Sequence, residues 1–250
     1  MSKWKIALIL LTGAICALSL RACGYESFGT YHFRLTIEVD TPAGIRSGAG
    51  VMAVSYGSRP YLPGGAIAVA KLRGEAVFVD LGNGRNVVAL LTHGRRGEDG
   101  SSISWLPVTA FTGAPSGWSS TEALRELEAR GKRLEGRVEL KPALIPTLVT
   151  FTDVSDPATA TKLDPSDLRY RFGEGYAFKR AILDIASPGI WPFNGLPISW
   201  PRWLFSEPVT HEIKSRLPFL IRPGEQLRAL RSANLSIGAF TEPYQAFWRN

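Results

Sequence analysis

The stretch Pro146-Thr-Leu-Val-Thr-Phe-Thr-Asp-Val-Ser-Asp-Pro157 contains the two signals that decide the fold of this chain. In its first half the residues alternate, so that Val149 and Phe151 would face one side of a strand and their neighbours the other. Its second half is a turn, because Asp153 and Asp156 can bond to their own backbone and the final proline ends any sheet pairing. The stretch therefore predicts a strand that stops at a polar turn.

Other segments extend this strand-and-turn pattern along the chain. The alternation is cleanest from Tyr31 to Asp40, which predicts a half-buried antiparallel strand with one wet face. The sequence Gly82-Asn-Gly84-Arg85 between two apolar runs predicts a β-hairpin. Further strands are expected at Ala49–Tyr56, Ile67–Leu72, Ala76–Leu81, Asn86–Leu91, Arg137–Leu140 and Tyr176–Ala186. With 25 glycines and 17 prolines in 250 residues, the composition favours a chain with many turns over a helical bundle.

Helices are expected to be few and short. Ser119-Ser-Thr-Glu122 matches a capping box, and Gly131 can close the helix that it begins. Asp164 can cap a second helix that has Pro165 at its first position and runs to about Phe172. The predicted fold class is therefore α+β and β-rich, with mainly antiparallel sheet and a few short helices after an N-terminal hydrophobic segment.

Two segments give weaker structural signals. Ile103–Phe111 is apolar but interrupted by Pro107, so we expect at best an edge strand there. Pro208–Leu217 is expected to be a short helix that the following proline stops. The expected organisation is a leader at residues 1–23 and a single β-rich domain at residues 24–250, with a sub-boundary near residues 113–136.

The leader has the pattern of an export signal. Lys3 and Lys5 precede an uncharged apolar run, Ile6–Leu20, which as a helix would be about 22 Å long. That length falls short of the roughly 30 Å hydrocarbon core, although flanking residues could extend it to a marginal span. The lysines are expected to stay cytoplasmic while the rest of the chain crosses. We therefore expect the protein at the cytoplasmic membrane, with its body in the periplasm or outside the cell.

The end of the leader is similar to a bacterial lipoprotein processing site. A leucine, Leu20, lies three residues before Cys23, which would become lipidated, but Arg21 occupies a position that normally holds a small uncharged residue. Three outcomes stay open: an uncleaved anchor, a lipidated Cys23 and a soluble cleaved protein. The only other cysteine is Cys16, so the exported body has no disulfide and its fold depends on core burial alone.

The charge of the chain does not indicate a nucleic-acid partner. The formal net charge is +7, and the leader supplies three of these charges. No helix or loop concentrates Lys and Arg with interleaved aromatic residues, as a groove that follows phosphates requires. We interpret the excess of Lys and Arg over Asp and Glu as charge on a solvated surface.

Several segments together resemble an uncharacterised family of bacterial exported or membrane-anchored proteins. The matching segments are Arg34–Gly44, Gly74–Gly82, Phe151-Thr-Asp-Val-Ser-Asp-Pro157, Leu163-Asp-Pro165, Lys179-Arg180, Glu207-Pro-Val-Thr and Arg216-Leu-Pro-Phe-Leu220. The resemblance covers most of residues 31–221 and implies an exported location and a β-rich body, but no activity. The chain departs from the family pattern between Ile185 and Glu207, where it has an insert of its own.

A group of carboxylates is the first candidate site. Asp153, Asp156, Asp164 and Asp167 could bind a hard cation or divide acid and base roles. Their spacing lacks the alternating acidic pattern and central glycine of a calcium loop. Aspartate before proline or at a helix start is also turn and cap chemistry, which is the interpretation that we prefer.

Histidines and nucleophiles give no motif. His211-Glu212 begins like a zinc-protease motif, but the second histidine is absent, and His32 and His93 lie on or beyond separate strands. No Gly-x-Ser-x-Gly sequence, supported Ser-x-x-Lys sequence or reactive cysteine appears. The sequence therefore predicts no metal site, no cofactor and no catalytic residue.

The insert at residues 187–206 is the most unusual segment. Its core carries five aromatic residues, Trp191, Phe193, Trp200, Trp203 and Phe205. It could be a contact surface for a partner or the membrane interface, or a lid over the protein's own core.

Taken together, these patterns favour a non-catalytic structural or interaction protein of the bacterial envelope, tethered to the membrane and binding an unknown protein partner. The alternative is a hydrolase or metal-dependent enzyme that uses the carboxylates around Asp153–Asp167.

Overall fold

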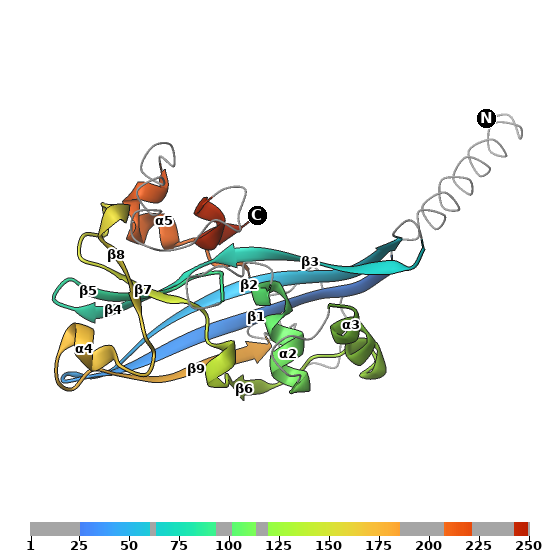
Figure 1. Cartoon of the computed structure of the whole chain (residues 1–250), viewed down its shortest axis with the longest axis horizontal. Helices are drawn as coiled ribbons and strands as arrows, with labels where there is room; N and C mark the ends of the chain where they lie inside the picture. Colours follow the sequence, from blue (N-terminus) through green and yellow to red (C-terminus); the bar gives the residue numbers. More distant parts are fainter. Residues whose placement is uncertain are drawn as a thin grey trace, which may run out of the picture.

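Two antiparallel β-sheets are the main regular structure in the part of the chain that the structure describes (Figure 1). The structure is a computed structural model of the whole chain, and it describes residues 26–60, 64–93, 102–113, 120–185, 208–221 and 243–249. The predicted fold class, a β-rich α+β fold with mainly antiparallel sheet and short helices, is confirmed. The N-terminal hydrophobic segment lies outside the described residues.

The first sheet has six strands in the order β10-β3-β2-β1-β9-β6. Its strands are β1 (Glu26–Thr41), β2 (Gly44–Pro60), β3 (Ala66–Glu75), β6 (Arg137–Glu139), β9 (Ala177–Ile185) and β10 (Trp248–Arg249). The hairpin of β1 and β2 is its centre, and Phe33 pairs with Met52 on one side and Ile185 on the other. Figure 1 shows β1, β2 and β3 running along the length of the molecule, with α2 and α3 toward one end.

The second sheet has four strands in the order β4-β5-β7-β8. Its strands are β4 (Val77–Gly82), β5 (Arg85–Ala89), β7 (Leu148–Phe151) and β8 (Ala160–Leu163). The predicted hairpin around Gly82–Arg85 is therefore confirmed, because β4 and β5 pair across it. The stretch that begins at Pro146 is also a strand followed by a polar turn, as predicted.

Short helices connect and cover the sheets. The α-helices are α2 (Leu106–Thr112), α3 (Ser120–Ala129), α4 (Leu168–Phe172) and α5 (Ile213–Arg216). The 3-10 helices are η1 (Ser102–Trp105), η2 (Pro142–Leu144), η3 (Pro157–Thr159), η5 (Pro218–Ile221) and η7 (Pro243–Ala246). In Figure 1, α5 and the C-terminal elements lie on one side of the β4–β5 hairpin, away from α2 and α3.

One length of chain belongs to both sheets. Only Ala76 separates the end of β3 from the start of β4, so the strand leaves the first sheet and enters the second at this point. The departure leaves part of one edge of β2 without β3 as a neighbour, and Thr210 occupies this place. The Thr210 N–H donates to the Val51 carbonyl at 3.1 Å, and the Val51 N–H donates to the Thr210 hydroxyl at 2.8 Å. The C-terminal segment is thereby bound to the central strand of the fold.

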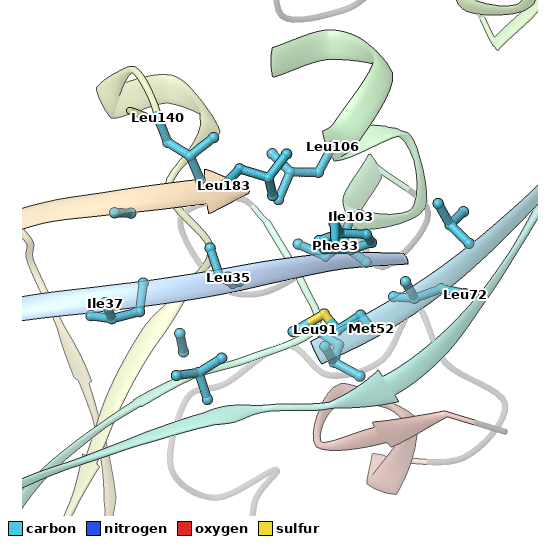
Figure 2. Close-up of a cluster of buried hydrophobic side chains, with 14 of the residues drawn as sticks. Phe33, Leu35, Ile37, Met52, Leu72, Leu91, Ile103, Leu106, Leu140 and Leu183 are labelled. Atoms are coloured by element: carbon cyan, nitrogen blue, oxygen red, sulfur yellow. The ribbon is translucent and has the colours of Figure 1, made fainter. Parts of the chain in front are cut away.

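The first hydrophobic core lies between the two sheets and extends under α2 and α3. Alternate residues of β1 face it, as predicted, and Phe33 and Ile37 are fully buried. Figure 2 shows this cluster, in which side chains of β1 and β2 meet Leu91, Ile103, Leu106 and Leu183. Ala123, Leu124 and Leu127 of α3 belong to this core, so α3 packs on the same core as the sheets.

The second hydrophobic core lies on the opposite face of the second sheet. Val88, Val149 and Phe151 point to this face, which α5, η5, η7 and β10 cover. Phe151, Phe219 and Phe247 form a cluster with ring centroids 5.5 to 6.3 Å apart. The second sheet is thus buried on both faces, which explains why β5 is an unbroken apolar run after Asn86.

Three local predictions differ from the structure. Ile103–Phe111 is helical, in η1 and α2, because Pro107 lies in the first turn of α2, where its missing N–H costs nothing, and Gly113 ends the helix at a φ of 72°. Asp167, not Asp164, caps the short helix α4. Within Pro208–Leu217 only α5 is helical, since Thr210 pairs with the edge of β2.

Candidate functional site

The four predicted carboxylates each accept hydrogen bonds from their own turn. They lie where β7 and β8 end, beside η3 and α4. Asp153, Asp156, Asp164 and Asp167 accept from the N–H groups of Ser155, Ala158, Ser166 and Tyr170 at 2.8, 2.8, 2.9 and 3.2 Å, respectively. Across the described ranges, no three His, Cys, Asp or Glu side chains lie together in a way that could hold a metal ion. These bonds are the cap and turn chemistry that stabilises short helices and loops.

The turn around Asp164 shifts the pKa of its carboxyl group. The Ser166 hydroxyl donates to it at 2.6 Å and the Ser166 N–H at 2.9 Å. Both donors favour the ionised form, so they hold the pKa of Asp164 below its usual value. The side chain is exposed, so the arrangement is that of a surface turn rather than a buried acid.

A buried carboxylate that the sequence did not single out lies where the strand changes sheets. Glu75 is 4% exposed and accepts from the Ile213 N–H at 2.8 Å, at the start of α5. The Nδ1 atom of His211, an exposed side chain, lies 3.5 Å from the same carboxylate. Glu75 therefore links the strand crossing to the C-terminal segment. No sequence signal predicted this contact, because 138 residues separate Glu75 from Ile213.

His93 and Ser102, two side chains of types that act in catalysis, lie within hydrogen-bond distance of each other. The His93 Nδ1 atom lies 2.8 Å from the Ser102 hydroxyl, and its Nε2 atom lies 2.9 Å from the Leu144 carbonyl. A carbonyl oxygen can only accept, so Nε2 carries a proton and Nδ1 of the neutral ring accepts from the serine hydroxyl. Sequence reasoning missed this pair, because the three groups come from the end of β5, the start of η1 and the end of η2.

We call the face of the six-stranded sheet that points away from the first core its outer face. Its charged residues differ between its two halves. The basic surface consists of four exposed residues on this face, Arg34, Lys71, Arg73 and Arg137. His32, half-buried, lies on the same face, and Asp184 pairs in register with both Arg34 and Arg137.

The opposite half of this face carries paired charges. Glu38 and Arg180 lie 2.8 Å apart, and Asp40 and Lys179 lie 3.3 Å apart. The Glu38 carboxylate, by its hydrogen bonds and its charge, raises the pKa of Arg180. This half is therefore close to neutral, while the other half is positive.

A cavity of about 320 Å³ opens between β10, η1 and the edge of β3. Its walls include Lys71, Ser104, Gln245, Trp248 and Arg249. The guanidinium of Arg249 donates to the carbonyls of Leu91 and Gln245 and to the Ser104 hydroxyl, so it holds β10 against η1. The polar groups around the cavity thus serve the packing of the C-terminal strand.

Two of the predicted sites lie outside the described residues. These are the lipidation candidate Cys23 and the aromatic contact surface Trp191, Phe193, Trp200, Trp203 and Phe205. Among the helices that the structure does describe, none combines the length and the apolar character needed to cross a bilayer.

Comparisons of the chain with protein-family models, with curated proteins and with solved structures found no match.

Proposed function

We propose that this chain is a structural or interaction protein of the bacterial cell envelope, held at the cytoplasmic membrane by its N-terminal segment. The basic leader with its fifteen-residue apolar run supports the placement. The body offers a sheet with one face in the core and charged, exposed residues on part of the other face, which is suited to presenting a contact surface.

The observation that carries the proposal is the charge division of the outer sheet face. The excess of exposed cations in the basic surface favours an acidic partner, because complementary potentials accelerate encounter and suppress wrong partners. The contact surface of the envelope protein is therefore the basic surface, and its partner is an acidic protein. The aromatic segment Trp191–Phe205 is a second contact candidate that the proposal retains.

The chemistry of the carboxylates also supports this role over the alternative of an enzyme that uses Asp153–Asp167. A general acid, a general base or a metal ligand must direct its oxygens toward a substrate or an ion. Asp153 and Asp156 instead accept N–H groups of their own turn at 2.8 Å. Their bonding is that of residues that shape the backbone.

Two measurements on the full chain test the two halves of the proposal separately. Membrane fractionation with mass spectrometry of the native N-terminus tests the tether, and freely dissolved protein with Met1 intact would refute it. Chemical cross-linking in cells tests the contact surface. We expect one defined cross-linked species with the parent, and its loss in the double variant Lys71→Glu/Arg73→Glu.

A matched control is available at the other end of the molecule. Arg46→Glu/Arg169→Glu makes the same change in net charge at two exposed positions outside the basic surface. We expect this variant to keep the cross-linked species. If both double variants lost it equally, net charge rather than this surface would be responsible.

A further inference from the structure

We propose that Ser102 is an activated nucleophile, with His93 as its general base, that accepts an acyl group from a carboxylic ester. This inference goes beyond the proposed function, which needs no reactive group.

The geometry of the pair meets the first requirement for nucleophilic catalysis. A serine hydroxyl is a weak nucleophile unless a base within about 2.6–3.2 Å takes its proton, and a third group must orient that base. Ser102 Oγ lies 2.8 Å from His93 Nδ1, and the Leu144 carbonyl accepts from His93 Nε2 at 2.9 Å. The carbonyl holds the proton on Nε2, so the nitrogen that faces the serine is the basic one.

The burial of the two side chains meets a second requirement. His93 is 8% exposed and lies beyond the end of β5, so its imidazole is shielded from competing water. Ser102 is half-buried at the start of η1. The hydroxyl-bearing residue is therefore less buried than the histidine that would activate it.

The step is a balanced acyl transfer. Ser102 Oγ forms a bond to the ester carbonyl carbon, His93 Nδ1 takes the hydroxyl proton, and the carbon–oxygen bond to the alcohol breaks. The imidazolium returns its proton to the departing alkoxide. Water then hydrolyses the acyl-serine by the same steps in reverse, with His93 again as the base, which releases a carboxylic acid and restores the hydroxyl.

A fluorophosphonate probe tests the proposal directly on the full chain. The probe forms an Oγ–phosphorus bond and releases fluoride, and the labelled serine is identified by peptide mass spectrometry. We expect labelling at Ser102, while Ser155 and Ser166, exposed serines in turns, stay unlabelled in the same sample and serve as internal controls. Absence of label at Ser102, or equal labelling of the three serines, would overturn the proposal.

The variant His93→Gln separates reactivity from structure. The glutamine amide can still donate a hydrogen bond to the Leu144 carbonyl, but it cannot take up a proton. Because general-base catalysis contributes about 10²–10⁴-fold, we expect the labelling rate to fall by at least about 100-fold with an unchanged melting temperature. A folded His93→Gln variant that is labelled at the parent rate would contradict the role of His93.

A second variant keeps the test decisive if His93→Gln fails to fold. Ser102→Cys places a thiol beside the same imidazole, and the thiolate, not the thiol, reacts with iodoacetamide. We expect this cysteine to be alkylated at least ten times faster than the cysteine of a Ser155→Cys variant, which lies in the exposed turn after β7. Equal or slower alkylation at position 102 would show that His93 does not activate the site.

Discussion

The two hydrophobic cores of this protein are assembled in different ways. The first core packs neighbouring hairpins against each other, with β1 and β2 in one sheet and β4 and β5 in the other. The second core joins segments that are distant in sequence, such as Val88, Phe151, Ile213 and Phe247. The first core therefore holds the two sheets together, whereas the second fixes the C-terminal segment to the opposite face of the second sheet.

The change with the largest expected effect breaks the first core. A Cβ atom at Gly48 would lie 2.1 Å from the Phe78 carbonyl oxygen, so Gly48 allows β2 to approach the backbone of β4. Backbone cannot move aside as a flexible side chain can, so Gly48→Ala should lower the free energy of unfolding by about 3 kcal/mol, the upper end of the usual cost of overpacking. Urea denaturation followed by tryptophan fluorescence measures this change.

Ala49→Val is the control for Gly48→Ala, because it enlarges the next residue of β2, which is exposed on the opposite face. We expect it to change the free energy of unfolding by no more than about 0.5 kcal/mol. A cost below about 1 kcal/mol for Gly48→Ala would mean that the sheets can separate without losing the first core.

An intermediate loss of stability is expected at Glu75, which binds the C-terminal segment that covers the second core. Glu75→Gln keeps an acceptor for the Ile213 N–H but removes the charge that faces this N–H and His211. Because hydrogen bonds to charged groups contribute more than neutral ones, the change should cost about 1 kcal/mol. The loss should be local. Hydrogen–deuterium exchange should therefore speed up in peptides from residues 208–221 and stay unchanged in β1 and β2.

Glu212→Gln is the matched control, because this exposed neighbour makes no side-chain bond to the start of α5. We expect its exchange pattern to equal that of the parent. If Glu75→Gln accelerated exchange in β1 and β2 as much as in α5, the two cores would be one cooperative unit and the comparison would fail.

The same contrast explains how much of the fold could be predicted. Alternation of apolar and polar residues predicted β1, and turn residues between two apolar runs predicted the β4–β5 hairpin, because both signals depend only on neighbouring residues. Burial on both faces of β5 and the passage from β3 into β4 could not be predicted, because they depend on which distant segments cover each face. Pro107 was read as a break in a strand, although the first turn of a helix also accepts proline.

The candidate site residues, too, could be predicted from the sequence only where their contacts are local. The turn chemistry around Asp153–Asp167 is local, and the sequence indicated it as the preferred interpretation of these carboxylates. The His93–Ser102 pair and the Glu75 contact join residues from different elements, and no spacing in the sequence marks them. The roles of Cys23 and of Trp191–Phe205 stay predictions.

The smallest expected effect concerns a turn at the rim of the first core. Asp164 lies between Leu163 and Leu168, which both belong to that core, but its carboxylate is exposed. Because the Ser166 hydroxyl and N–H lower the pKa of Asp164, the ionised form stabilises the fold above the unfolded pKa of about 3.9. This contribution is lost as the pH falls through the lower pKa of the folded state.

Asp164→Asn should therefore be slightly less stable than the parent at pH 7, and this difference in the free energy of unfolding should shrink toward pH 2. The difference should be small at both pH values, because solvent screens the exposed charge. Urea denaturation at both pH values measures it. Ser166→Ala is the companion variant, because it keeps the carboxylate and removes the donor that lowers its pKa most, so its difference from the parent should shrink with pH in the same way. A difference that stayed constant between the two pH values would mean that the turn supports the first core through its shape and not through its charge.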